Sequence, residues 1–304
     1  MADTETKKGK SKRDKDSAEK WKTTLEKVVD SLVIKLKRRE IRGSSSVALQ
    51  TAELLRTVVS KGKFSTVQTL LDEIRAVGLT LANGHPIEVA IGNTVRRVLH
   101  IVRSEHAASL KGDQGGEQIN VDMSLSLHKL LDNPPDSQLD ISADSQDQVP
   151  KLKHAIIEEI SNLMEEIRNA CVNIAEQAVE HIYAKEAILT FGISKTVSAF
   201  FKEAAKFRQF EVCVAESAPS YEGQKMAGLL AEAGIETTVI TDSAVFSMMP
   251  HINKVIIGTH AVLANGGLIA HTGAHNICLA AKHYNIPVVV VTGMHKVIVT
   301  VLPM

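Results

Sequence analysis

The apolar residues of the first hundred positions recur at helical spacing. Between Trp21 and Arg103 they form several stripes, which glycines at 43, 62, 78 and 84 interrupt. Residues three and four apart share one face of a helix, so each stripe predicts an amphipathic helix with one buried side. Another long stripe runs from Ile156 to Ile182, after Pro150, a residue that the first turn of a helix accommodates. The pattern predicts a helical domain over residues 20–185.

Two segments break this pattern. Residues 1–19 are rich in lysine and predict a solvated, disordered tail, with nuclear import or RNA contact as the alternative role. Residues 104–150 are rich in Gly, Pro, Asp, Ser and Gln, and only the stretch from Leu125 to Leu131 is apolar. Such a composition buries little apolar surface, so a flexible insertion within the helical domain is expected.

After Lys185 the period changes to short apolar runs that alternate with amphipathic segments. The predicted strands are Ala187–Phe191, Val212–Ala215, Thr237–Thr241, Val255–Ile257 and Val288–Thr292. The predicted helices are Lys195–Phe207, Tyr221–Ala233, Val245–Met249 and Ala274–Tyr284. This alternation is typical of a doubly wound parallel sheet, and the run Val288–Val291 predicts a strand buried on both faces. The fold class is α/β, with a helical domain followed by a Rossmann-like domain over 186–304.

Composition narrows the function classes. The chain has 304 residues, is 44% hydrophobic, and carries 35 basic and 35 acidic residues. A net charge of zero disfavours a nucleic-acid partner and favours association with other proteins. The chain opens without an apolar leader and holds no apolar run long enough for a membrane span, so a cytoplasmic (cytosolic) protein is expected. The cysteines at 171, 213 and 278 lie in apolar runs and predict buried, reduced thiols.

Ligands of doubly wound sheets bind beyond the carboxyl ends of the strands, which directs attention to Thr190–Ser194, Glu216–Pro219 and Gly258–His275. These glycine-rich segments are either structural turns or an anion site, and no GxGxxG or P-loop pattern is present. The spacing of His260, His271 and His275 matches no metal motif, so hydrogen bonding is the preferred role, with no metal and no cofactor expected. Asp242 follows a strand and is expected to cap a helix rather than to act as a base.

Several segments of the second half resemble, in order, a known family. They are Ile182–Thr196, Val214–Pro219, Gly234–Asp242, Asn253–Thr259, Leu263–Gly267, Ala280–His283 and Ile286–Pro287. The chain resembles the alpha, beta and delta regulatory subunits of translation initiation factor 2B, and the segments Ala215–Pro219 and Gly234–Val239 resemble the beta type most. The resemblance covers about residues 20–103 and 150–296.

The same fold resembles the methylthioribose-1-phosphate and ribose-bisphosphate isomerases, and this resemblance bears on catalysis. Those enzymes carry a cysteine where this chain has Gly192, and an aspartate where it has Gly267. Proton transfer in a ring-opened sugar needs such groups, so no catalytic residue and no isomerase activity is expected. The turn Arg42-Gly43-Ser44 resembles the phosphate-holding turn of the isomerases. It is either an anion-binding remnant or a plain turn between helices.

The resemblance implies a non-catalytic regulatory subunit of the complex that exchanges GDP for GTP on initiation factor 2. It implies a delta-like partner together with alpha, gamma and epsilon subunits in a decamer. It also implies contact with the alpha subunit of initiation factor 2, whose phosphorylation the complex senses in the integrated stress response. Predicted subunit contacts are Thr190, Phe191, Ser194, Thr238, Ile240, Asp242, Asn265, His271, Thr272 and His275. The alternatives are an active sugar-phosphate isomerase and a sensor of a sugar phosphate or nucleotide.

The carboxyl terminus departs from the family pattern. Val297–Met304 does not follow the expected continuation after Lys296. This departure predicts a truncated form that lacks a terminal strand. Because a missing strand leaves a sheet edge open, lower stability or impaired assembly is expected.

Overall fold

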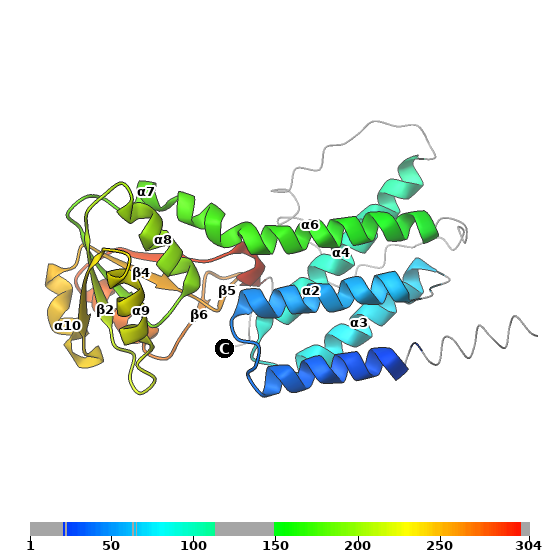
Figure 1. Ribbon diagram of the computed structural model, residues 1–304, viewed down its shortest axis with the longest axis horizontal. Coiled ribbons are helices and arrows are strands. Elements are labelled where there is room, and N and C mark those ends of the chain that lie inside the picture. The colour runs from blue at the N-terminus through cyan, green and yellow to red at the C-terminus, as the bar shows by residue number, and fades with distance from the viewer. Residues whose placement is uncertain (1–20, 22, 63, 65, 113–148, 299–304) are drawn as a thin grey trace, which may run out of the picture. The chain divides into compact units, whose positions relative to one another are not determined.

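The computed structural model describes residues 21, 23–62, 64, 66–112 and 149–298 (Figure 1). The predicted amino-terminal tail and most of the predicted insertion lie outside these residues, as do the last six positions. The described chain divides into two compact units, with the boundary after Glu166. This boundary falls inside a helix, whereas the change in apolar period had predicted a division after Lys185.

Unit 1 consists of helices, as predicted. Residues 23–37 form the first, and α2 (Ser44–Lys61), α3 (Val67–Gly84), α4 (Val89–Gly112) and the first part of α6 (Val149–Glu176) follow. The side chains of the apolar stripes make the core; fully buried examples are Leu55, Leu71, Ile91 and Ile156. Helix α4 continues to Gly112, so the expectation of a flexible segment from residue 104 was wrong for its first turns. Alanine, serine and leucine continue the helix there.

Unit 2 contains a five-stranded parallel sheet in the order β3-β2-β1-β4-β7. The strands are β1 (Ala187–Phe191), β2 (Glu211–Ala215), β3 (Glu236–Ile240), β4 (Lys254–Gly258) and β7 (Val288–Val291). The chain winds outward from β1 through β2 to β3, and in the other direction through β4 to β7. The predicted doubly wound fold is thereby confirmed, with its switch point between β1 and β4.

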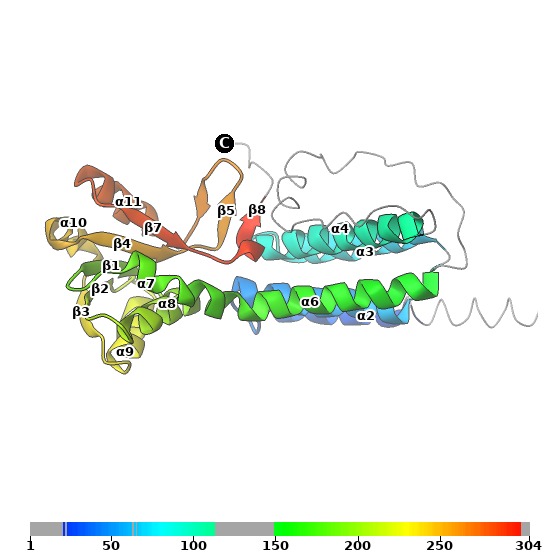
Figure 2. The same ribbon diagram turned by 90° about the horizontal axis from the view of Figure 1, so that it is seen from above.

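Helices cover both faces of this sheet (Figure 2). On one face lie α7 (Ala178–His181), α8 (Lys195–Ala205) and α9 (Glu222–Ala231), which share a core with Ile188, Val212 and Ile256. On the other lie α10 (Val245–Met248) and α11 (Ala274–His283), which share a second core with Leu189, Val255 and Ile257. Alternate side chains of the central strands thus enter two separate cores, as the pleat requires.

Two expectations about burial were wrong. Strand β7 is at the edge of the described sheet, and Val288–Val290 are only half-buried. The continuous apolar run Val288–Val291 had predicted burial on both faces. The prediction failed because an apolar run does not show whether a neighbouring strand is present. Of the three cysteines only Cys213 is buried, while Cys171 and Cys278 are half-buried; all three are free thiols.

A small second sheet was not predicted. It consists of β5 (Ala261–Leu263), β6 (Leu268–Ile269) and β8 (Val297–Ile298), in the order β6-β5-β8. Short 3-10 helices, Asp242–Ala244 (η1), Met249–His251 (η2) and Met294–Lys296 (η3), complete the unit. Among the described residues, no helix is both long and apolar enough to cross a membrane.

Candidate functional site

The loops that follow β1 and β4 meet at the switch point of the sheet. The hydroxyl of Ser194 accepts a hydrogen bond from the backbone N–H of Val197 (3.4 Å) and so caps α8. A Cβ on Gly258, at the end of β4, would lie 2.8 Å from the Ser194 hydroxyl oxygen. The loops after β1 and β4 are therefore closely packed at this point, with little room for a side chain at position 258.

The loop after β2 is held by Asp242. The N–H of Ser217 donates to Oδ1 of Asp242 (2.9 Å), and the N–H of Ala218 donates to Oδ2 (2.8 Å). Ser217 has a positive φ of 61°, a conformation that the two hydrogen bonds stabilise. The expectation that Asp242 caps its own helix was wrong: no side-chain cap is found at η1, and the carboxylate instead joins two loops.

Two histidines approach each other at the same edge. The rings of His260 and His271 have centroids 5.0 Å apart, and Nε2 of His271 is 3.9 Å from Oε2 of Glu222 in α9. Nearby, the hydroxyl of Thr259 reaches the carbonyl oxygens of Ala261 (2.9 Å) and Ile269 (2.7 Å), which fixes the start of the β5–β6 arm. Within the described residues, no group of three His, Cys, Asp or Glu side chains has the geometry of a metal site.

Of the two positions that distinguish this chain from the isomerases, 192 has a backbone conformation that favours glycine, and 267 directly follows a glycine in such a conformation. Gly192 has φ +65° and Gly266, beside Gly267, has φ +77°. A Cβ on Gly267 would lie 2.9 Å from Oδ1 of Asn265, which already accepts the Gly267 N–H at 3.0 Å. The hairpin therefore uses position 267 for a tight turn, and neither glycine supplies a proton-carrying side chain.

The turn that resembles a phosphate-holding turn belongs to unit 1. Arg42 is exposed, and its Nε donates to the carbonyl oxygen of Arg39 (3.1 Å). Gly43 has φ 89° and precedes the first turn of α2, where Ser44 is buried. The guanidinium thus has one local backbone partner. Whether the turn holds an anion stays a prediction.

Most predicted contact residues lie at the surface of unit 2. Exposed are Thr238, Asp242, Asn265, His271, Thr272 and His275, and half-buried are Phe191, Ser194 and Ile240. The prediction that Thr190 contacts another subunit was wrong, because the residue is only 1% exposed within the central strand β1. The remaining residues stay predictions.

A cluster at the opposite edge of the sheet was missed. Nζ of Lys254 donates to the carbonyl oxygen of His181 and lies 3.2 Å from Oε2 of Glu186. The same ammonium and the Arg208 guanidinium lie over the ring of Tyr183, at 5.0 and 5.3 Å from its centroid. The sequence alone did not indicate this cluster, because its members come from three segments that are far apart in the chain: residues 181–186, Arg208 and Lys254. The cluster ties the amino ends of β1 and β4 to the preceding helix.

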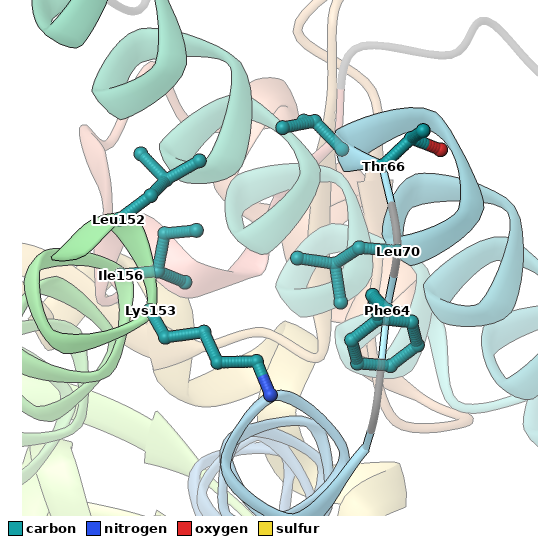
Figure 3. Close-up of a pocket in the computed structure, with 7 residues that line it drawn as sticks. Phe64, Thr66, Leu70, Leu152, Lys153 and Ile156 are labelled. Carbon is teal, nitrogen blue, oxygen red and sulfur yellow. The ribbon is translucent and has the colours of Figure 1, made fainter. Parts of the chain in front are cut away.

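In the described part of unit 1, a small hollow lies between α3 and α6 (Figure 3). Phe64, Leu70, Leu152 and Ile156 line it, and the Lys153 ammonium donates to the Gly62 carbonyl oxygen and lies 5.5 Å from the Phe64 ring centroid. Burial lowers the pKa of Lys153 from its usual value. The hollow offers about 10 Å³, room for at most one water molecule, so it is a packing defect rather than a ligand site.

The fold and the loops at the carboxyl edge of the sheet together define a class of protein. It has a helical unit followed by a doubly wound, Rossmann-like sheet, and these loops contain no GxGxxG or P-loop motif for nucleotide binding. The model of the Initiation factor 2 subunit family matches residues 40–302, and the chain belongs to this family. The predicted resemblance is thereby confirmed.

Curated relatives agree with this assignment. The chain is 44% identical over 297 residues to "Translation initiation factor eIF2B subunit beta" of Dictyostelium discoideum, covering 88% of this chain and 76% of the relative. It is 37% identical over 303 residues to the protein of the same name in Schizosaccharomyces pombe, covering 88% and 77%. The predicted likeness to the beta type is confirmed by both.

Solved structures show the same fold. The tetrameric eIF2B-beta2-delta2 complex from Chaetomium thermophilum matches with a TM-score of 0.73 at 30% identity, over 90% of this chain and 80% of that one. The structure of eIF2B beta from the same organism matches with a TM-score of 0.70 at 30% identity, over 90% and 77%.

Proposed function

We propose that this chain is a beta-type regulatory subunit of eIF2B, the complex that recharges translation initiation factor 2 with GTP. The observation that carries the proposal is the 44% identity to a named eIF2B beta subunit over 88% of the chain. The beta2-delta2 complex among the similar structures supports assembly with a delta-type subunit. The proposal extends this assembly to the alpha, gamma and epsilon subunits.

The proposed subunit has no chemistry of its own. Gly192 and Gly267 stand where the related isomerases need a thiol and a carboxylate, and Gly192 has a φ of +65°, which favours glycine. Its role is to hold the exchange complex together and to receive the alpha subunit of initiation factor 2 in the cytosol. Phosphorylation of that factor then lowers exchange through coupling between distinct sites.

The test is reconstitution of the complex with and without this chain. We expect co-expressed chain to co-purify with a delta-type subunit, and the complete complex to release GDP from initiation factor 2 faster than the catalytic subunit alone. Phosphorylated factor should slow this release only when the chain is present.

Two results would contradict the proposal. One is a complex that assembles and responds to phosphorylation equally well without the chain. The other is interconversion of an aldose phosphate and a ketose phosphate by the isolated chain.

A further inference from the structure

We draw no further inference here: the strongest candidate, the apolar surface patch of the helical unit at the carboxyl end of α3 and in the turn after it, where Leu79 is 64% and Ile87 is 78% exposed, carries none because nothing in the structure shows what covers it.

Discussion

Asp242 shows how one side chain organises the carboxyl edge of the sheet. Its two oxygens accept the N–H groups of Ser217 and Ala218, so the ends of β2 and β3 are joined by two charge-assisted hydrogen bonds. The carboxylate itself is exposed to solvent, which moderates the strength of both bonds.

We expect Asp242→Ala to lower the free energy of unfolding by about 1–2 kcal/mol, because both backbone donors lose their partner. Asp242→Asn should lose less, since its amide oxygen retains one bond. Glu203→Ala is the control: its pair with Lys206 lies on the surface of α8 and should change stability by less than about 0.5 kcal/mol. Urea unfolding measures all three, and equal losses for Asp242→Ala and Glu203→Ala would contradict the assigned role.

At the scale of one element, α9 contains two glycines with opposite requirements. A Cβ on Gly223 would lie 2.0 Å from the carbonyl oxygen of Ala215, at the end of β2. A Cβ on Gly228 would have no atom within 4 Å, and its backbone is ordinary helix. The first glycine sets how closely α9 packs on the sheet, and the second serves no packing purpose.

The same substitution should therefore have opposite effects within one helix. We expect Gly223→Ala to destabilise the protein by about 2–4 kcal/mol, since a backbone atom cannot move aside as a side chain can. Gly228→Ala should stabilise it by about 0.5–1 kcal/mol through helix propensity. Thermal unfolding of the two variants provides the comparison, and a stabilising Gly223→Ala would show that α9 lies farther from β2.

The carboxylates of helices α4 and α6 allow a second test at the scale of elements. Burial, followed by the neighbouring carboxylates Glu159 and Glu158, raises the pKa of Glu105 above its usual value. A raised pKa in the folded state means that ionisation of Glu105 opposes folding, a penalty present above that pKa and absent below the unfolded value.

We expect Glu105→Gln to raise stability at pH 7 by a few tenths of a kcal/mol, a small figure because water screens this largely solvated group. The gain should disappear as the pH falls below about 4.5, where the unchanged chain is protonated. Glu165→Gln, an exposed neighbour on α6, is the control and should have no effect at either pH. Urea unfolding across this pH range gives the profile, and a gain that persists in acid would contradict the electrostatic cause.

Which elements the sequence could predict depended on their length. All five strands of the main sheet were predicted to within about one residue at each end, because each is four or five residues long and lies between clear breaks. The strands β5, β6 and β8, of three, two and two residues, were not predicted, since so few positions carry no period.

The site was harder to predict than the fold. Position in a parallel sheet placed the loops at one edge, but the partner of Asp242 is 25 residues away in sequence, and local capping rules cannot find it. Phe246 and Leu279 were missed because an apolar residue in a helical segment is read as core. Only the packed structure shows that they face outward.

At the scale of the whole molecule, charge is balanced. The chain carries 35 basic and 35 acidic residues, and its isoelectric point calculated from the sequence is about 7.2. A protein with no net charge has little self-repulsion. Strand β7, at the edge of the described sheet, and exposed apolar side chains such as Phe246 and Leu279 offer surfaces for association.

We expect the isolated chain to be least soluble near neutral pH and to become more soluble toward about pH 5.5, where its net charge is positive. The double variant Lys202→Glu, Lys225→Glu changes the formal net charge by −4, two units for each substitution, and should restore solubility at pH 7 while moving the minimum to lower pH. Both lysines are exposed on helices α8 and α9, so the change adds negative charge to the surface without altering the core. Precipitation by polyethylene glycol across pH measures the minimum. A minimum that stays in place in the double variant would show that apolar surface, rather than charge, governs self-association.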